Sequence, residues 1–157
     1  ASGVLSQRGA QVFRPEHGVR LSAVDERIAQ KLMPALEAGA FDPPWVRDLV
    51  ASARESEVQL RMVMGRLAQR GDLHQVVKDL YYPTRTMSRL AQLARAIARR
   101  DGEIKAAAFR DATGLGRKRA IQVLEYFDRV GLLRRVQESH RLRPDTELFT
   151  ETEPEIA

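Results

Sequence analysis

The chain has 157 residues, of which 43% are hydrophobic and 30% are charged, a composition typical of a folded domain and not of a disordered one. It contains no cysteine, which excludes disulfides and thiolate metal sites, and its 3 histidines show no ligand spacing, so we expect no metal. No apolar run approaches the length of a membrane span, and the N-terminus has neither an initiator Met nor a signal-peptide core. We therefore expect a cytoplasmic, excised piece of a longer protein.

The net charge of +5 is distributed unevenly along the chain. Residues 1–83 carry +1, residues 84–144 carry +9 and residues 145–157 carry −5. A block with such an excess of positive charge attracts polyanions, of which nucleic acid is the most common. We favour this interpretation over the alternative, a charged surface that serves only solubility.

Helices are predicted soon after the N-terminus. Residues 1–20 are expected to be a linker or the remnant of a preceding domain, with 11–14 as a candidate last strand. A helix is predicted over residues 21–38, with Ser22 as a plausible N-cap. A second helix is predicted to start at residues 42–44, because two prolines there would occupy its first turn.

A repeat then becomes visible, because residues 56–71 align with residues 116–131 without a gap, at an offset of 60. Both segments have apolar side chains with helical spacing, which marks one buried helical face. Both end in glycine, which suits the left-handed conformation at a helix C-terminus. The matched positions include Val63 with Val123, Leu67 with Phe127 and Gly71 with Gly131.

The segments after the two glycines predict a hairpin in each copy. Each segment alternates apolar and polar residues around a short polar turn, which is typical of two antiparallel strands. The offset places these turns at Lys78 and Asp79 in the first copy and at Glu138 and Ser139 in the second.

The second copy also has its own upstream elements. An amphipathic helix is predicted over residues 84–100, a short extended piece over 102–104, and another helix over 106–113 that stops at Gly114. The order helix, short strand, helix, helix, hairpin is that of a winged helix, in which the hairpin forms the wing.

The expected fold is therefore mainly α with small β-hairpins (α+β), built from two tandem winged-helix domains. These domains are expected over residues 21–83 and 84–144. The acidic tail over residues 145–157 is expected to be disordered.

The candidate binding site lies at the start of the last helix of the second copy, where Arg117, Lys118 and Arg119 follow Gly116. The first copy has Glu57, Val58 and Gln59 at the positions of these cations. Because the core positions of the two copies agree, the fold does not require cations there. The N–H groups and the positive dipole end of a helix favour a bound phosphate at this position.

The wing supplies further candidates. They are Arg135, His140, Arg141 and Arg143, with Arg134 as an additional cation. His140 could stack on an exposed base, although a solvent-exposed wing histidine without a role is the alternative.

The outward face of the last helix favours RNA over DNA. With positions 120, 124 and 127 buried, Glu125 is expected near the centre of the face that a DNA-reading helix inserts into the major groove. Cations at the helix start and on the wing suit backbone contact with a shaped RNA hairpin instead.

The string FRDATGLGRKRAIQVLEYFDRVG, residues 109–131, resembles the last winged helix of the bacterial selenocysteine-specific translation elongation factors. Residues 67–72 together with 79–83 resemble the preceding winged helix less specifically, and the whole resemblance covers about residues 10–145. It implies an excised tail whose second winged helix binds the mRNA stem-loop of the selenocysteine insertion element. The first winged helix is then a spacer.

By this resemblance, Arg117 and Lys118 match the RNA-contacting helix start of the family, and Arg141 and Arg143 match its basic wing. The wing turn over residues 136–140 departs from the pattern, since it has no glycine and contains an acid. The ribosome and selenocysteinyl-tRNA are implied as partners through the missing parent domains. The piece itself is expected to be a monomer without a membrane contact.

No phosphate-binding loop of the form G-x-x-x-x-G-K-[ST] occurs, so the GTPase of the family is expected to be absent from this chain. We expect neither an enzyme nor a cofactor. Two other classes stay open. One is a winged-helix DNA-binding transcriptional regulator, and the other is a protein-interaction module that uses the winged helix as a docking surface.

Overall fold

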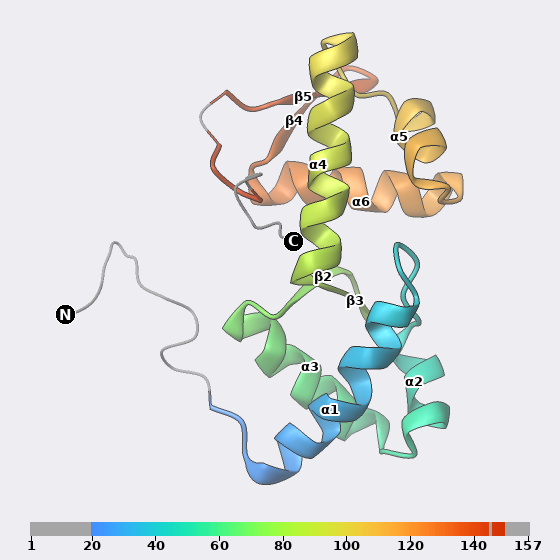
Figure 1. Ribbon diagram of the computed structural model, residues 1–157, viewed down its shortest axis with the longest axis vertical. Helices are drawn as coiled ribbons and strands as arrows, with labels where there is room; N and C mark the ends of the chain where they lie inside the picture. Colours follow the sequence, from blue (N-terminus) through green and yellow to red (C-terminus); the bar gives the residue numbers. More distant parts are fainter. Residues whose placement is uncertain (1–19, 145, 150–157) are drawn as a thin grey trace, which may run out of the picture. The chain divides into compact units, whose positions relative to one another are not determined.

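The computed structural model describes residues 20–144 and 146–149, which fall into two compact units. The first unit comprises the described residues up to 39 together with 43–84, and the second comprises 40–42 and the described residues from 85 onward. Each unit has three helices and a two-stranded antiparallel hairpin (Figure 1). The predicted fold class, two tandem winged helices, is confirmed.

The first unit follows the predicted order of elements. They are α1 (Ala23–Ala38), α2 (Val46–Ala53), α3 (Glu57–Arg70), β2 (Leu73–Val77) and β3 (Leu80–Pro83). Its core is aliphatic and draws on all three helices and the hairpin, through residues such as Ile28, Leu49, Leu67 and Leu73.

The start of α1 is as predicted, but the start of α2 is not. Ser22 caps α1, because its Oγ accepts the Asp25 N–H at 3.1 Å while the Asp25 carboxylate accepts the Ser22 N–H at 3.3 Å. In α2 the two prolines precede the helix instead of forming its first turn. Trp45 is the N-cap, and the Asp48 carboxylate accepts the Trp45 N–H at 3.2 Å, so the first turn begins at Val46.

The Asp25 carboxylate is buried, with 2% of its side chain exposed, and it also accepts a hydrogen bond from the Arg66 guanidinium. Burial alone would raise the pKa of Asp25, but the Ser22 amide and Arg66 together bring this pKa below its ordinary value of 3.8. A carboxylate with a lowered pKa stabilises the fold above its unfolded pKa, and that stability is lost as the pH falls through the folded pKa.

We therefore expect the Asp25→Asn variant to melt at a lower temperature than the wild type at neutral pH, with a gap that narrows once the pH falls below about 4. Thermal unfolding of the full chain, followed by circular dichroism from pH 7 down to about pH 2, measures this gap. Glu26→Gln removes an exposed carboxylate from the same turn and is the matched control. A gap that stays constant over the whole range would contradict the role of the Asp25 charge.

The second unit also follows the predicted order. Its elements are α4 (Thr84–Asp101), α5 (Ala106–Thr113), α6 (Arg117–Val130), β4 (Leu133–Val136) and β5 (Ser139–Leu142). Gly114 and Gly131 end α5 and α6 in the left-handed conformation, with φ of 77° and 95°, as expected. The extended piece at Ile104 forms an antiparallel bridge with His140 and so joins the wing.

The wing turn lies one residue earlier than the repeat predicts. Strands β4 and β5 pair in register from Leu133 opposite Leu142 to Val136 opposite Ser139, so the turn consists of Gln137 and Glu138. In the first copy, the pairing shifts by one residue between Gln75 and Val77. This irregularity makes the first hairpin one residue longer, and a fixed offset of 60 therefore fails at the turn.

Four residues of the predicted disordered tail are described, and two of them contact helices α4 and α6 of the second unit. The Leu148 carbonyl accepts a hydrogen bond from Arg95 at 2.6 Å, and the Phe149 ring meets the edge of Phe127 with a centroid distance of 5.9 Å. These contacts hold Leu148 and Phe149 against the second unit, and the disorder of the tail stays a prediction. The candidate strand over residues 11–14 and the tail from residue 150 lie outside the described residues. Within the described part, no helix is both long and apolar enough to cross a membrane.

Candidate nucleic-acid interface

The start of α6 is held in place by the loop before it. Thr113 Oγ1 accepts the Leu115 N–H at 3.2 Å, and the Leu115 side chain is buried, with 7% of the residue exposed. Gly116 is the N-cap of α6 and supplies no side-chain hydrogen bond to the first turn. The loop is thus anchored on the domain, while the first amides of α6 have no side-chain acceptor from their cap.

In the first winged helix, a side chain caps the equivalent helix start. Ser56, the N-cap of α3, accepts the Gln59 N–H with its hydroxyl at 3.1 Å. A side chain at Gly116 would meet nothing within 4 Å of its Cβ, and its φ of −68° suits any residue. The fold would therefore accept a serine there too. Glycine leaves the N–H groups of α6 available to an anion, which helix N-termini bind well.

The structure separates the predicted basic triplet into two outward cations and one inward cation. Arg117 and Lys118 are exposed, and within the described residues neither has an ion pair. The Arg119 side chain is only 13% exposed and pairs with Asp42, which belongs to the same unit. Arg117 and Lys118 are therefore the stronger candidates for contact with a ligand.

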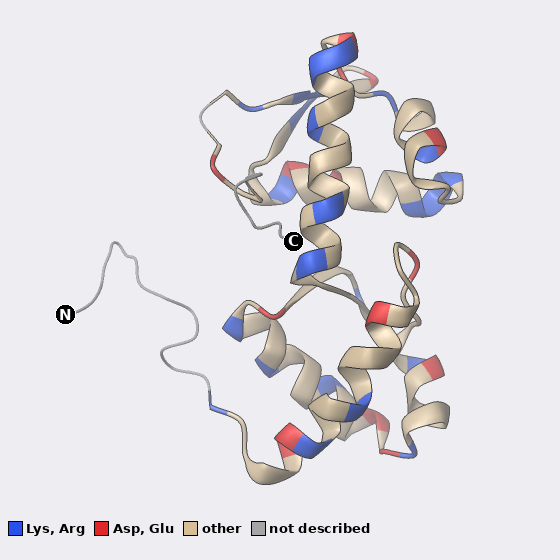
Figure 2. Ribbon diagram, viewed as in Figure 1, with Lys and Arg blue, Asp and Glu red and all other residues tan. Residues whose placement is uncertain are grey.

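The cations of α3 behave differently, because each one pairs with a carboxylate. Arg61 binds Asp79 at 2.8 Å, and this pairing raises the pKa of the guanidinium. The other two pairs are Arg66 with Asp25 and Arg70 with Asp72. The first winged helix thus neutralises its third helix internally, whereas the second presents cations at the start of α6 (Figure 2).

The wing presents two cations side by side. The register of β4 and β5 places Arg134 directly opposite Arg141, and both are exposed. Like charges that face each other across strands are unfavourable unless an anion joins them. Arg134 is thus better placed for binding than Arg135, which donates from Nε to the Gln137 carbonyl at 3.0 Å and holds the wing's own turn. The alternation of side chains along the strands could have identified Arg134 as the stronger candidate from the sequence, but only with the turn placed at residues 137 and 138.

A cavity lies at the base of the wing. It has a volume of about 430 Å³ and is lined by Gly131, Arg134, Arg143, Pro144 and Thr146. The Arg143 N–H donates to the Leu132 carbonyl at 3.0 Å, which fixes the backbone next to the cavity. The predicted candidate Arg143 and the additional cation Arg134 therefore line one concave, cationic surface.

His140 is not the exposed wing residue that we expected. Only 6% of the residue is exposed, and Nδ1 lies 2.9 Å from the Asp128 carboxylate on α6. Its backbone N–H and carbonyl pair with Ile104 at 2.9 and 2.8 Å. In this arrangement the ring joins the wing to α6 and is not available to stack on a base.

The outward face of α6 is as predicted. Lys118, Glu125 and Arg129 are exposed, while Ala120, Leu124 and Phe127 are buried. The Arg129 guanidinium lies 5.4 Å from the ring centroid of Tyr126, a cation–π contact at the far end of the helix. No cluster of three or more histidines or acids that could hold a metal occurs among the residues described.

Two family models match the chain, one for each winged helix. The model described as "Selenocysteine-specific elongation factor, winged helix domain" matches residues 22–82, and "Elongation factor SelB, winged helix" matches residues 95–142. The selenocysteine-specific elongation factor of Escherichia coli is 37% identical over 150 residues, which are 96% of this chain and 24% of that protein. The Haemophilus influenzae factor is 31% identical over 141 residues, or 90% and 23% of the two chains. This chain thus spans about a quarter of the length of these relatives.

Solved structures agree with these matches. The mRNA-binding domain of elongation factor SelB from E. coli, determined in complex with SECIS RNA, aligns with a TM-score of 0.73 and 39% identity, covering 78% of this chain and 99% of that one. A bacterial selenocysteine-specific elongation factor EF-Sec aligns with a TM-score of 0.63 over 78% of this chain and 19% of its own, at 19% identity, which supports the fold alone. The chain belongs to the family of SelB winged-helix domains.

Proposed function

We propose that this chain binds an mRNA stem-loop of the selenocysteine insertion (SECIS) type through its second winged helix, as part of a selenocysteine-specific elongation factor. The observation that carries the proposal is the contrast between the two copies at the start of their third helix. In one copy a serine caps the helix and its cations are paired, whereas in the other a glycine leaves the cap open next to Arg117 and Lys118. The similarity to the E. coli domain determined with SECIS RNA supports the same ligand.

RNA is favoured over duplex DNA by the outward face of α6. Glu125 is exposed in the middle of that face, where a helix inserted into the major groove would bring it against bases and phosphates. Four exposed cations lie instead at the helix start and on the wing, at Arg117, Lys118, Arg134 and Arg141. This distribution suits a stem-loop that is held by its backbone from two sides.

The proposal is tested by titrating the full chain against a labelled SECIS stem-loop, and against duplex DNA of matched length, at one salt concentration. Non-specific phosphate contacts are available to both nucleic acids, so a difference in affinity reports specific contacts with the stem-loop. We expect the stem-loop to bind at least tenfold more tightly. A preference for duplex DNA would instead favour the winged-helix regulator, and failure to bind either would favour the protein-interaction module.

The first winged helix is proposed to be a spacer. The ion pairs of α3 support this role, because they neutralise all three of its arginines, whereas α6 begins with exposed cations that have no ion pair within the described residues. Contacts with the ribosome and with selenocysteinyl-tRNA, and a cytoplasmic location, are proposed for the longer factor as a whole and follow from its role in translation.

Glu125 tests how the stem-loop meets α6. Glu125 lies seven residues after Lys118, or about 10 Å along the helix axis, beyond the Debye length of about 8 Å in 0.15 M salt. If only the first turn touches RNA, Glu125→Gln should leave the affinity within about twofold at that salt concentration.

The matched control for this experiment is Gln122→Glu, which places an acid one turn nearer to Lys118 on the same face. At about 6 Å along the axis, this acid lies inside the screening length and should weaken binding more than Glu125→Gln changes it. A tenfold change on Glu125→Gln, or an altered base preference, would mean that α6 is inserted along its length.

A further inference from the structure

The stem-loop site leaves a second group of cations unexplained. Helix α4 carries 5 arginines and a single acid, Asp101, so it holds +4 within one helix. Its first turn contains no acidic residue. Figure 2 shows basic residues, in blue, along the whole length of α4; they are distinct from the basic residues at the start of α6.

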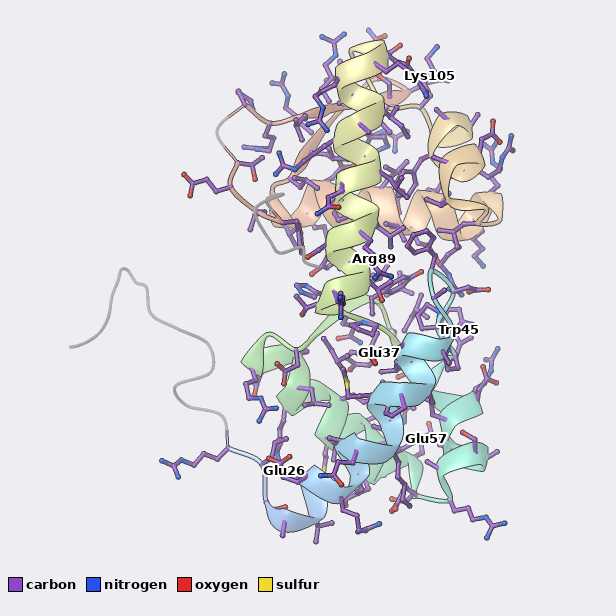
Figure 3. All side chains as sticks on the ribbon, in the orientation of Figure 1. Glu26, Glu37, Trp45, Glu57, Arg89 and Lys105 are labelled. Carbon is purple, nitrogen blue, oxygen red and sulfur yellow. The ribbon has the colours of Figure 1, made fainter. Side chains whose placement is uncertain are left out.

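Four of the arginines share one side of the helix, which we call the α4 face. At 100° per residue, the four positions fall within an arc of about 100°. All four are exposed, while the buried residues Met87, Leu90 and Ala94 lie on the opposite side. The α4 face consists of Arg85, Arg89, Arg99 and Arg100, and Arg89 is marked in Figure 3.

Helix stability does not account for Arg85 and Arg89. Arg99 and Arg100 lie in the last turn, where cations are favourable, and Arg100 pairs with Asp101 at 2.8 Å. The i,i+4 neighbours on α4 are pairs of like charge, Arg85 with Arg89 and Arg95 with Arg99, and such pairs are unfavourable. Arg85 also lies in the first turn, at the positive end of the helix dipole, and within the described residues neither Arg85 nor Arg89 has an ion pair. A surface that served only solubility would mix both signs of charge.

The first winged helix is again an internal control. Its first helix, α1, carries three acids and two basic residues, Arg27 and Lys31. Both basic residues donate to the Glu55 carboxylate, at 2.9 and 2.6 Å. The winged-helix fold therefore does not require cations such as Arg85 and Arg89 near the start of its first helix, just as it does not require them at the start of its third.

We propose that the α4 face binds the sugar–phosphate backbone of a second RNA segment, so that the second winged helix can hold two RNA segments at once. The pairs Arg85 with Arg89 and Arg99 with Arg100 are separated by ten residues, about 15 Å along the axis. A compact anion would meet only one pair, whereas a polymer backbone can meet both. The site is separate from the stem-loop site at the start of α6. RNA binding by the α4 face does not depend on the stem-loop function, whereas the simultaneous binding of two RNA segments rests on it.

The test uses the full chain with the stem-loop site occupied by an excess of unlabelled SECIS stem-loop. A labelled RNA duplex of unrelated sequence, longer than α4, is then titrated in. We expect it to bind the wild type and to lose at least tenfold in affinity in Arg85→Gln/Arg89→Gln. The slope of log K against log salt should flatten by up to about two units, one for each lost phosphate contact. Arg54→Gln/Lys78→Gln removes the same charge from exposed positions of the first unit and should change the affinity by less than threefold.

The proposal is overturned if Arg85→Gln/Arg89→Gln binds the duplex as tightly as the wild type, or if the stem-loop displaces the duplex completely. If the wild type does not bind the stem-loop, the proposed function fails, and the same titration on Arg117→Gln/Lys118→Gln still decides the role of the α4 face. A single-stranded extension of the stem-loop that raises the affinity only in the wild type would support the proposal, with the second segment in the same mRNA. If the separate duplex binds but the extension does not raise the affinity, the proposal is also supported, and the second segment then belongs to a separate RNA.

Discussion

Replacing Arg117 and Lys118 together by alanine is expected to lower the affinity for the SECIS stem-loop roughly fiftyfold in about 0.1 M salt. Both side chains are exposed at the start of α6, and within the described residues neither has an ion pair. Each phosphate contact contributes up to about one unit to the slope of log K against log salt, so two lost contacts should flatten it by up to about two. Fluorescence anisotropy at several salt concentrations measures both quantities.

Stability should hardly change in this double variant. The two side chains make no ion pair within the described residues, so the free energy of unfolding should stay within about 0.5 kcal/mol of the wild type. Removing cations from the first turn also relieves an unfavourable interaction with the helix dipole. Arg54→Gln/Lys78→Gln, which lowers the net charge equally in the first unit, separates a local contact from general attraction. An affinity within twofold of the wild type would leave the start of α6 without a role in binding.

Gly116→Ser sharpens the same test, because it gives α6 the cap that Ser56 gives α3. A serine hydroxyl would accept one of the amide hydrogens that we assign to a phosphate. The free energy of unfolding should rise by a few tenths of a kcal/mol, since serine caps helices slightly better than glycine. The affinity for the stem-loop should fall, so the variant would be more stable and bind more weakly. Equal or tighter binding would argue against the amides as the phosphate site.

Local signals predicted most of the fold. The helices of both copies follow from apolar spacing, and Gly71, Gly114 and Gly131 end three of them where expected. The cap at Ser22 was also predictable, because a side chain three residues away completes it. Interactions of this kind lie within one turn of helix, and the sequence pattern records them directly.

The features that the sequence did not predict depend on residues far apart or on strand register. Arg119 pairs with Asp42, 77 residues away, so its inward position cannot be recognised from the basic triplet. The irregular pairing between Gln75 and Val77 shifts one hairpin by a residue, and the repeat alone then misplaces the turn of the other. Like-charge neighbours across a hairpin become visible only once this register is known.

His140 is the clearest example, and it separates the two interpretations of the wing by experiment. The phenyl ring of His140→Phe could still stack on a base, but it could not bond to Asp128 on α6. In the structure, that bond joins the wing to α6 where the Asp128 side chain is 20% exposed. A largely buried carboxylate that loses its partner typically costs about 1–3 kcal/mol. We therefore expect the free energy of unfolding of His140→Phe to fall by about that amount.

Urea unfolding of the full chain measures this loss, and Asp128→Asn together with the double variant completes a thermodynamic cycle. Because His140 and Asp128 contact each other, the sum of the losses of unfolding free energy in the two single variants should exceed the loss in the double variant. His140→Gln, whose amide can still donate to Asp128, should recover part of the stability. A base-stacking histidine would give another pattern: wild-type stability in His140→Phe, stem-loop binding retained there, and binding lost in His140→Gln. We expect the stability pattern, because the ring of His140 is buried against α6 and is not presented to solvent.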